Sequence, residues 1–175
     1  MVMTIIGLFL TGHGAGGRML IETIVLCSLI SVSIGAFLPA HAAVVHYLKS
    51  ADPSLYANFP FLPGIYHMET LTALRDPSAI YRVGEHTMVG LNTFPSMHTA
   101  TAILLLVFAR GTWLALPSWS FAVPMLMATP VWGGHYFIDI FAGTAMALAV
   151  AFAVHRSHGV HGLWRPAALP SPAPV

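Results

Sequence analysis

The feature that most limits the fold of this chain is its shortage of charged side chains. Only 7% of its 175 residues are charged, whereas soluble domains carry roughly 25%. So few charges cannot cover a surface that faces water on all sides. We therefore expect an integral membrane protein whose main contact is with the lipid bilayer.

Four apolar segments predict the helices that cross or enter this bilayer. A spanning helix needs about 20 mostly apolar residues, and the segments 19–38 and 135–154 have this length. Two shorter apolar segments, 98–109 and 116–132, are separated by the turn signal "RGTW" and predict a helical hairpin. The predicted fold class is all-α: a polytopic membrane helical bundle with about four to five membrane helices and one long extracytoplasmic loop.

The remaining segments define the expected domain organisation. Residues 1–18 are predicted to form a partial or short N-terminal helix that ends at the glycine-rich "GHGAGGR". A secretory signal peptide is the alternative, but the segment lacks a basic n-region and an A-x-A-like cleavage site. Residues 19–156 are predicted to be the membrane domain, with the long polar loop at 41–95. Residues 157–175 are rich in Pro and Ala and are predicted to be a disordered tail.

The order of crossings predicts which residues share a face of the membrane. Counting from the segment 19–38, the long loop, His98 and His135 all fall on one side. The short connections on the other side carry most of the arginines, and the positive-inside rule assigns that side to the cytoplasm; these are Arg18, Arg110, Arg156 and Arg165. We expect a plasma-membrane or inner-membrane protein whose histidine face is extracytoplasmic.

Charge and cysteine content exclude two classes of function. The net charge of +1 leaves no basic patch that could neutralise a nucleic-acid backbone. The single cysteine, Cys27, lies inside an apolar segment, so neither a disulfide framework nor a cysteine metal cluster is expected. The oligomeric state is not indicated by any sequence feature.

The segment "GGHYFIDIFAG" carries a histidine and a carboxylate four residues apart. This spacing predicts that His135 and Asp139 lie on one helix face. The carboxylate could then accept the Nδ1 proton of the imidazole and leave Nε2 available as a nucleophile or ligand. A structural His–Asp pair that ties two helices together has the same spacing, so the pair alone leaves both interpretations open.

The segment "FPSMH" favours the chemical interpretation. It places His98 on the same membrane face as His135, at a helix start for which Ser96 is a suitable N-cap. Two helix N-termini, a serine hydroxyl and the Gly133–Gly134 backbone offer the N–H and O–H donors of an anion site. Two histidines at an anion site predict phosphoryl transfer, in which one imidazole attacks phosphorus and the other protonates the leaving oxygen.

Together, "FPSMH" and "HYFID" resemble the type 2 phosphatidic acid phosphatase superfamily, which shares its site with vanadium haloperoxidases. Of the signature K-x6-R-P, P-S-G-H and S-R-x5-H-x3-D, the second part appears with Met97 in place of glycine. The third appears as His135-x3-Asp139, with Ala128-Thr129 where Ser-Arg would stand, and the first is not recognisable. Within the superfamily, "TPVWGGHYFIDIFAGTA" is most similar to the branch that contains inositol phosphorylceramide synthases.

The resemblance implies a role for each matching residue. His135 would be the nucleophile that forms a phosphohistidine, Asp139 would orient it, His98 would be the general acid, and Ser96 would bind phosphate. The implied substrate is a lipid phosphate or diphosphate, and neither a metal nor another cofactor is implied. Water as the acceptor makes the chain a phosphatase, and a second alcohol makes it a phosphotransferase.

The cations of the family signature are the part that is missing. Phosphoryl transfer relies on positive charge around the phosphate oxygens. Three cations on the histidine face could replace them, namely Arg82, Arg75 and Lys49, and Arg82 is favoured because it precedes the "FPSMH" segment. An exposed loop arginine is the ordinary alternative for Arg82. If none of the three reaches the site, a weak or inactive member that binds anionic lipid is the alternative function.

A histidine pathway for metal transport is a third hypothesis. It is disfavoured because the histidines are divided between the two faces of the membrane. His155, His158 and His161 in "HRSHGVHG" lie opposite the proposed site and are expected to form a juxtamembrane tail.

Overall fold

The computed structural model describes two main segments of the chain and a few single positions. These are residues 1–38, 40, 43, 46–47, 78, 93–130 and 134–159. Most of the predicted loop 41–95 and the tail beyond residue 159 lie outside them. So do several residues that the sequence analysis singled out: Lys49, Arg75, Arg82, Gly133, His161 and Arg165.

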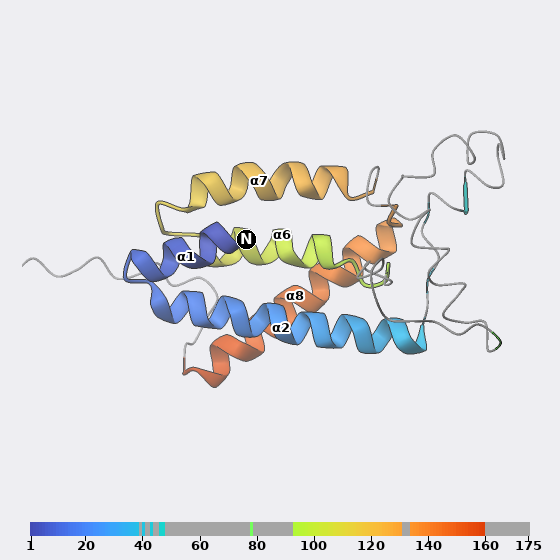
Figure 1. Cartoon of the computed structure of the whole chain (residues 1–175), viewed down its shortest axis with the longest axis horizontal. Coiled ribbons are helices and arrows are strands. Elements are labelled where there is room, and N and C mark those ends of the chain that lie inside the picture. The colour runs from blue at the N-terminus through green and yellow to red at the C-terminus, as the bar shows by residue number, and fades with distance from the viewer. Residues whose placement is uncertain are drawn as a thin grey trace, which may run out of the picture.

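The described residues form helices and no strand, which confirms the all-α prediction for this part of the chain (Figure 1). The helices are α1 (Val2–Leu10), α2 (Gly14–Phe37), α6 (Met97–Phe108), α7 (Ala115–Ala128) and α8 (Phe137–Ser157).

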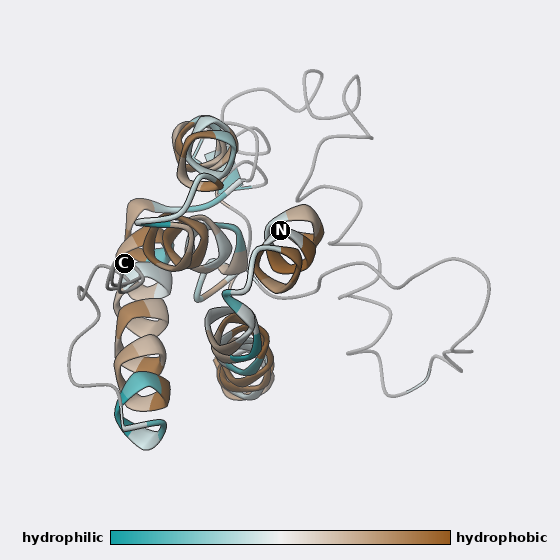
Figure 2. Cartoon of the chain, turned by 90° about the vertical axis from the view of Figure 1, so that its left-hand side faces the viewer, coloured by the Kyte–Doolittle hydropathy of each residue, from teal (hydrophilic) through white to brown (hydrophobic). Residues whose placement is uncertain are grey.

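Two of these helices, α2 and α8, are long and apolar enough to cross a membrane. In the most apolar 18-residue stretch of each helix, only 22% of α2 and 28% of α8 is buried inside the protein. Large apolar side chains such as Val32 and Phe141 point outward instead. The core helix of a soluble protein would be mostly buried, so these exposed apolar faces indicate contact with lipid. In Figure 2, brown marks the hydrophobic residues along these helices.

The predicted hairpin is present as α6 and α7, but both helices are short. With 12 residues, α6 is about 18 Å long, less than the roughly 30 Å of the hydrocarbon core. It packs against α2, α7 and α8, and α1 packs against α2. The described helices are thus two that could span a membrane and three shorter apolar ones. The predicted number of four to five membrane helices stays a prediction.

The helices alternate in direction, as the crossing order predicts. Figure 1 shows the starts of α6 and α8 near the end of α2, at one end of the bundle. The start of α2 and the ends of α6 and α8 lie at the opposite end. Arg18, Arg110 and Arg156 belong to those opposite termini, so the described arginines lie far along the bundle from His98 and His135.

The core is built around the buried face of α6. Leu104 and Ala100 pack with Leu20 and Cys27 of α2 and with Ala147 of α8, and all of these side chains are almost fully buried. Alanines on α8 let its backbone approach α6 closely, as small residues do in membrane helix pairs. This packing fixes the first turns of α6 and α8 relative to each other.

The start of α2 differs from the sequence prediction. The "GHGAGGR" segment does not separate two helices along its whole length, because α2 already begins at Gly14. The turn is confined to the residues before it, with Gly12 at a φ of +80°. Gly17 lies inside α2, where a Cβ would collide with the ring of Phe9. The glycines therefore allow α1 to fold back against α2.

A buried leucine of α6 tests the packing of this core. Leu104→Ala should lower the free energy of unfolding by about 2–5 kcal/mol, because it leaves a cavity among three helices. Thermal unfolding of the purified protein in detergent measures this change. Leu116 on α7 is 79% exposed, so Leu116→Ala should change stability by no more than about 0.5 kcal/mol. Equal losses in the two variants would contradict the described core.

Candidate active site

Ser96 caps the start of α6, as the sequence predicts. Its Oγ accepts hydrogen bonds from the backbone N–H of Thr99 at 3.3 Å and from the Thr99 hydroxyl at 3.2 Å. The side chain is fully buried. Both contacts use Ser96 Oγ as the acceptor. A bound phosphate would therefore have to accept a hydrogen bond that the Ser96 hydroxyl donates. Its role as a phosphate ligand stays a prediction.

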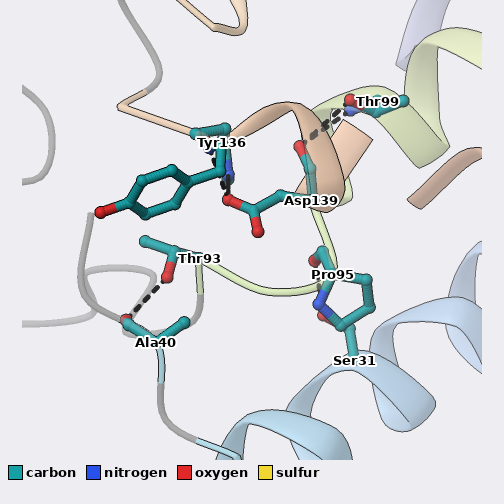
Figure 3. A network of polar contacts seen from close by, with 9 residues as sticks. Ser31, Ala40, Thr93, Pro95, Thr99, Tyr136 and Asp139 are labelled. Carbon is teal, nitrogen blue, oxygen red and sulfur yellow. Dashed lines mark hydrogen bonds and ion pairs between the residues drawn. The ribbon is translucent and has the colours of Figure 1, made fainter. Parts of the chain in front are cut away.

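Asp139 has a structural role at the start of α8 that the sequence analysis missed. Its Oδ2 accepts the backbone N–H of Tyr136, the N-cap residue, at 2.8 Å (Figure 3). Asp139 is 1% exposed and lies in the first turn, where the helix dipole favours a negative charge. An acid three residues after a helix cap is the sequence signal for this contact.

His135 lies before α8, so the prediction that His135 and Asp139 share a helix face is wrong. The helix begins only at Phe137. The two side chains nevertheless meet, with His135 Nδ1 3.4 Å from Asp139 Oδ2, and both are buried. Among the described residues, His135 Nδ1 has no hydrogen-bond partner. Asp139 therefore supplies a negative charge beside the imidazole, while its direct hydrogen bond goes to the backbone of Tyr136.

The two predicted catalytic histidines lie side by side. The ring centroids of His98 and His135 are 5.7 Å apart, with an angle of 65° between the ring planes. His98 is exposed and His135 is buried, so one ring faces outward and the other lies beneath it. The structure thus brings together His98, His135 and Asp139, from two helix starts that lie far apart in the sequence.

Burial and the neighbouring imidazole both act on the charge of His98. His98 lies outside the two spans, and its pKa is lowered, first by burial of part of the ring and then by the positive charge of His135. The site without an anion therefore favours neutral His98. A bound phosphate would reverse this effect, because an adjacent negative charge stabilises the imidazolium.

An aromatic group adjoins the site and was also missed by the sequence analysis. The rings of Tyr136 and Tyr47 have centroids 6.3 Å apart, and Tyr47 meets His46 at 5.4 Å. The pKa of Tyr136 is raised by burial, by Tyr47 and by Asp139. Only the position of Tyr136 directly after His135 hinted at this arrangement.

The cation expected at the site is not among the described residues. Arg82, together with Arg75 and Lys49, lies outside them. The arginines that the structure does describe belong to the opposite end of the bundle, so the assignment of Arg82 as a phosphate ligand stays a prediction.

Histidines at that opposite end have structural partners. His158 Nε2 pairs with Glu22 Oε2 at 2.8 Å, which links α8 to α2. His155 Nδ1 donates to the carbonyl of Ala151 at 2.8 Å, and its ring lies against Phe108. Within the described segments, no three His, Cys, Asp or Glu side chains are grouped so that they could hold a metal ion. The described histidines at this end therefore give no support to the metal-transport hypothesis.

Comparison with known proteins identifies the family. A family model described as the PAP2 superfamily matches residues 1–153, so the chain belongs to this superfamily. Its members are typically phosphatases. The match includes α1 as well as the two histidine segments. No curated protein and no solved structure matches the chain, and the inositol phosphorylceramide synthase-like branch is not confirmed.

The lowered pKa of His98 predicts a pH-dependent affinity for anions. Binding a phosphate analogue should raise the pKa of His98, so the complex takes up a proton. Affinity should then fall by up to about tenfold per pH unit as the pH rises through the histidine range. Calorimetric titration with tungstate, whose own charge is constant near neutral pH, measures this slope. The slope should flatten in His98→Gln, and an unchanged slope in that variant would contradict the assignment.

Proposed function

We propose that this PAP2 superfamily member is an integral membrane phosphatase or phosphotransferase that acts on a lipid phosphate or diphosphate through a phosphohistidine intermediate. The observation that carries the proposal is the contact between His98 and His135, with Asp139 beside the buried ring. The superfamily match over residues 1–153 supports the reaction class.

The first half of the proposed reaction transfers the phosphoryl group to the protein. Nε2 of neutral His135 attacks phosphorus, and the bond from phosphorus to the leaving alkoxide or phosphate oxygen breaks. Protonated His98 donates its proton to that oxygen. The new phosphohistidine ring carries positive charge, which the Asp139 carboxylate stabilises from 3.4 Å. A substrate phosphate raises the pKa of His98 and so supplies the protonated acid that this step requires.

The second half releases the phosphoryl group to an acceptor. Neutral His98 takes a proton from water or from an alcohol, whose oxygen attacks phosphorus as the bond to His135 Nε2 breaks. Water gives inorganic phosphate. An alcohol gives a new phosphomonoester, and transfer to an alcohol is the outcome that the resemblance to inositol phosphorylceramide synthases favours.

The surroundings of the site favour an amphiphilic substrate. His98 is exposed at the end of the bundle, while the outward faces of α2 and α8 are apolar. A phosphate head could reach the histidines while its acyl or prenyl tail stays in lipid. The arginines at the opposite end favour a cytoplasmic location for that end, and so we place the site on the extracytoplasmic side.

A second candidate is a protein of the same fold that binds anionic lipid without catalysis. It is favoured by the arginines of the described segments, none of which lies at the histidine end. The two candidates differ in whether His135 becomes covalently modified, because binding alone requires only its positive charge or its N–H group.

Phosphate release from phosphatidic acid and from a polyprenyl diphosphate tests the proposal. The protein is purified in detergent and assayed in mixed micelles with each substrate. Wild type should release phosphate, His135→Ala should lose the activity, and His98→Ala should lower it by about 10²- to 10⁴-fold. His158→Ala is the matched control, because His158 pairs with Glu22 at the other end of the bundle and should leave the rate unchanged. Equal activity in wild type and His135→Ala would reject the mechanism.

A further inference from the structure

The segment that leads into His98 is held by backbone contacts to two helices. Ser31 of α2 donates a hydrogen bond to the carbonyl of Pro95 at 3.3 Å (Figure 3). The backbone N–H of Ser96 donates to the carbonyl of Asp139, in the first turn of α8, at 3.1 Å. Residues 95 and 96 therefore lie between α2 and α8, directly before the helix that carries His98.

One turn further along α8, Gly143 lies against the same residue. A Cβ on Gly143 would overlap the carbonyl oxygen of Ser96 and would lie 3.2 Å from its carbonyl carbon and 3.3 Å from its nitrogen. All three contacts are with backbone, which cannot rotate away as a side chain does. The Ser96 carbonyl also accepts the N–H of Ala100 at 3.0 Å, so displacing it would disturb the first turn of α6.

This close approach distinguishes Gly143 from three other glycines in the described helices. A Cβ on Gly7 or on Gly17 would meet only the side chains of Leu114 or Phe9, which can move. A Cβ on Gly16 would meet nothing within 4 Å. Compared with Gly7, Gly16 and Gly17, Gly143 is therefore the glycine whose missing side chain permits contact between two backbones.

We propose that Gly143 is a positioning residue that sets the separation of His98 and His135. Asp139 and Gly143 are one turn apart on α8, and together they present a carbonyl and a bare Cα to Ser96. His98 follows Ser96 by two residues, and His135 precedes Asp139 by four. The distance between the two rings therefore depends on how closely α8 approaches Ser96.

The consequence for chemistry rests on the proposed function. A methyl group at Gly143 would push the start of α6 away from α8 and separate the acid from the nucleophile. Misplacement of a catalytic group by about 1 Å can cost 10²-fold in rate. Gly143→Ala should therefore lower kcat by about 10²-fold, with a smaller change in KM, because the exposed entrance to the site is retained.

A titration of His98 tests the positioning role without relying on activity. In wild type, partial burial and the charge of His135 lower the pKa of His98. Separating the rings weakens both causes, so the pKa of His98 in Gly143→Ala should rise toward the ordinary histidine value. NMR titration of the full chain with labelled histidine side chains measures this shift, and His98→Gln identifies the resonance.

Two further variants complete the test. Gly16→Ala is the matched control and should leave both the titration and kcat unchanged. Should Gly143→Ala fail to fold, Ser31→Ala replaces it, since losing the bond to Pro95 loosens the same segment and should shift the pKa of His98 in the same direction. If His98 in folded Gly143→Ala titrates as it does in wild type, the proposal is overturned. Where Ser31→Ala replaces that variant, the same result in Ser31→Ala overturns it. A shifted titration in a chain whose wild type releases no phosphate would support the positioning role and reject only the proposed function.

Discussion

The hydrogen bond from the Ser96 N–H to the Asp139 carbonyl is the contact on which the site depends. It joins two backbone segments that are 43 residues apart in the chain, at 3.1 Å. Each segment starts a helix and carries a histidine, so this backbone contact helps to set how the two imidazoles face each other. The packing of Leu104 against α2 and α8 holds the helices behind this contact.

Much of this arrangement could be predicted from the sequence, because membrane helices are encoded by local composition. The shortage of charge and the apolar segments predict the helices, and the serine in "FPSMH" predicts the N-cap. The start of α8 could not be predicted in the same way. The His135–Asp139 spacing fits a helix face, but Tyr136 takes the N-cap position and His135 remains outside. The role of Gly143 depends on a distant backbone and has no local pattern.

The described part of the site contains neither arginine nor lysine. The described residues offer helix N-termini, a serine hydroxyl and two imidazoles, which together donate hydrogen bonds with little fixed positive charge. Such a site gains its positive charge when the anion arrives, because the phosphate itself favours protonation of His98. Arg82, if it reaches the site, would add a permanent charge to this arrangement.

The phosphohistidine mechanism is tested most directly by searching for a phosphoryl group on His135. Wild-type protein is mixed with a lipid phosphate substrate, quenched with alkali to preserve any phosphohistidine, digested, and analysed by mass spectrometry. An acid-labile phosphoryl group should form on His135 within one turnover and decay as the product appears. Phosphate release without modification of His135, or with the phosphoryl group on another residue, would contradict the mechanism.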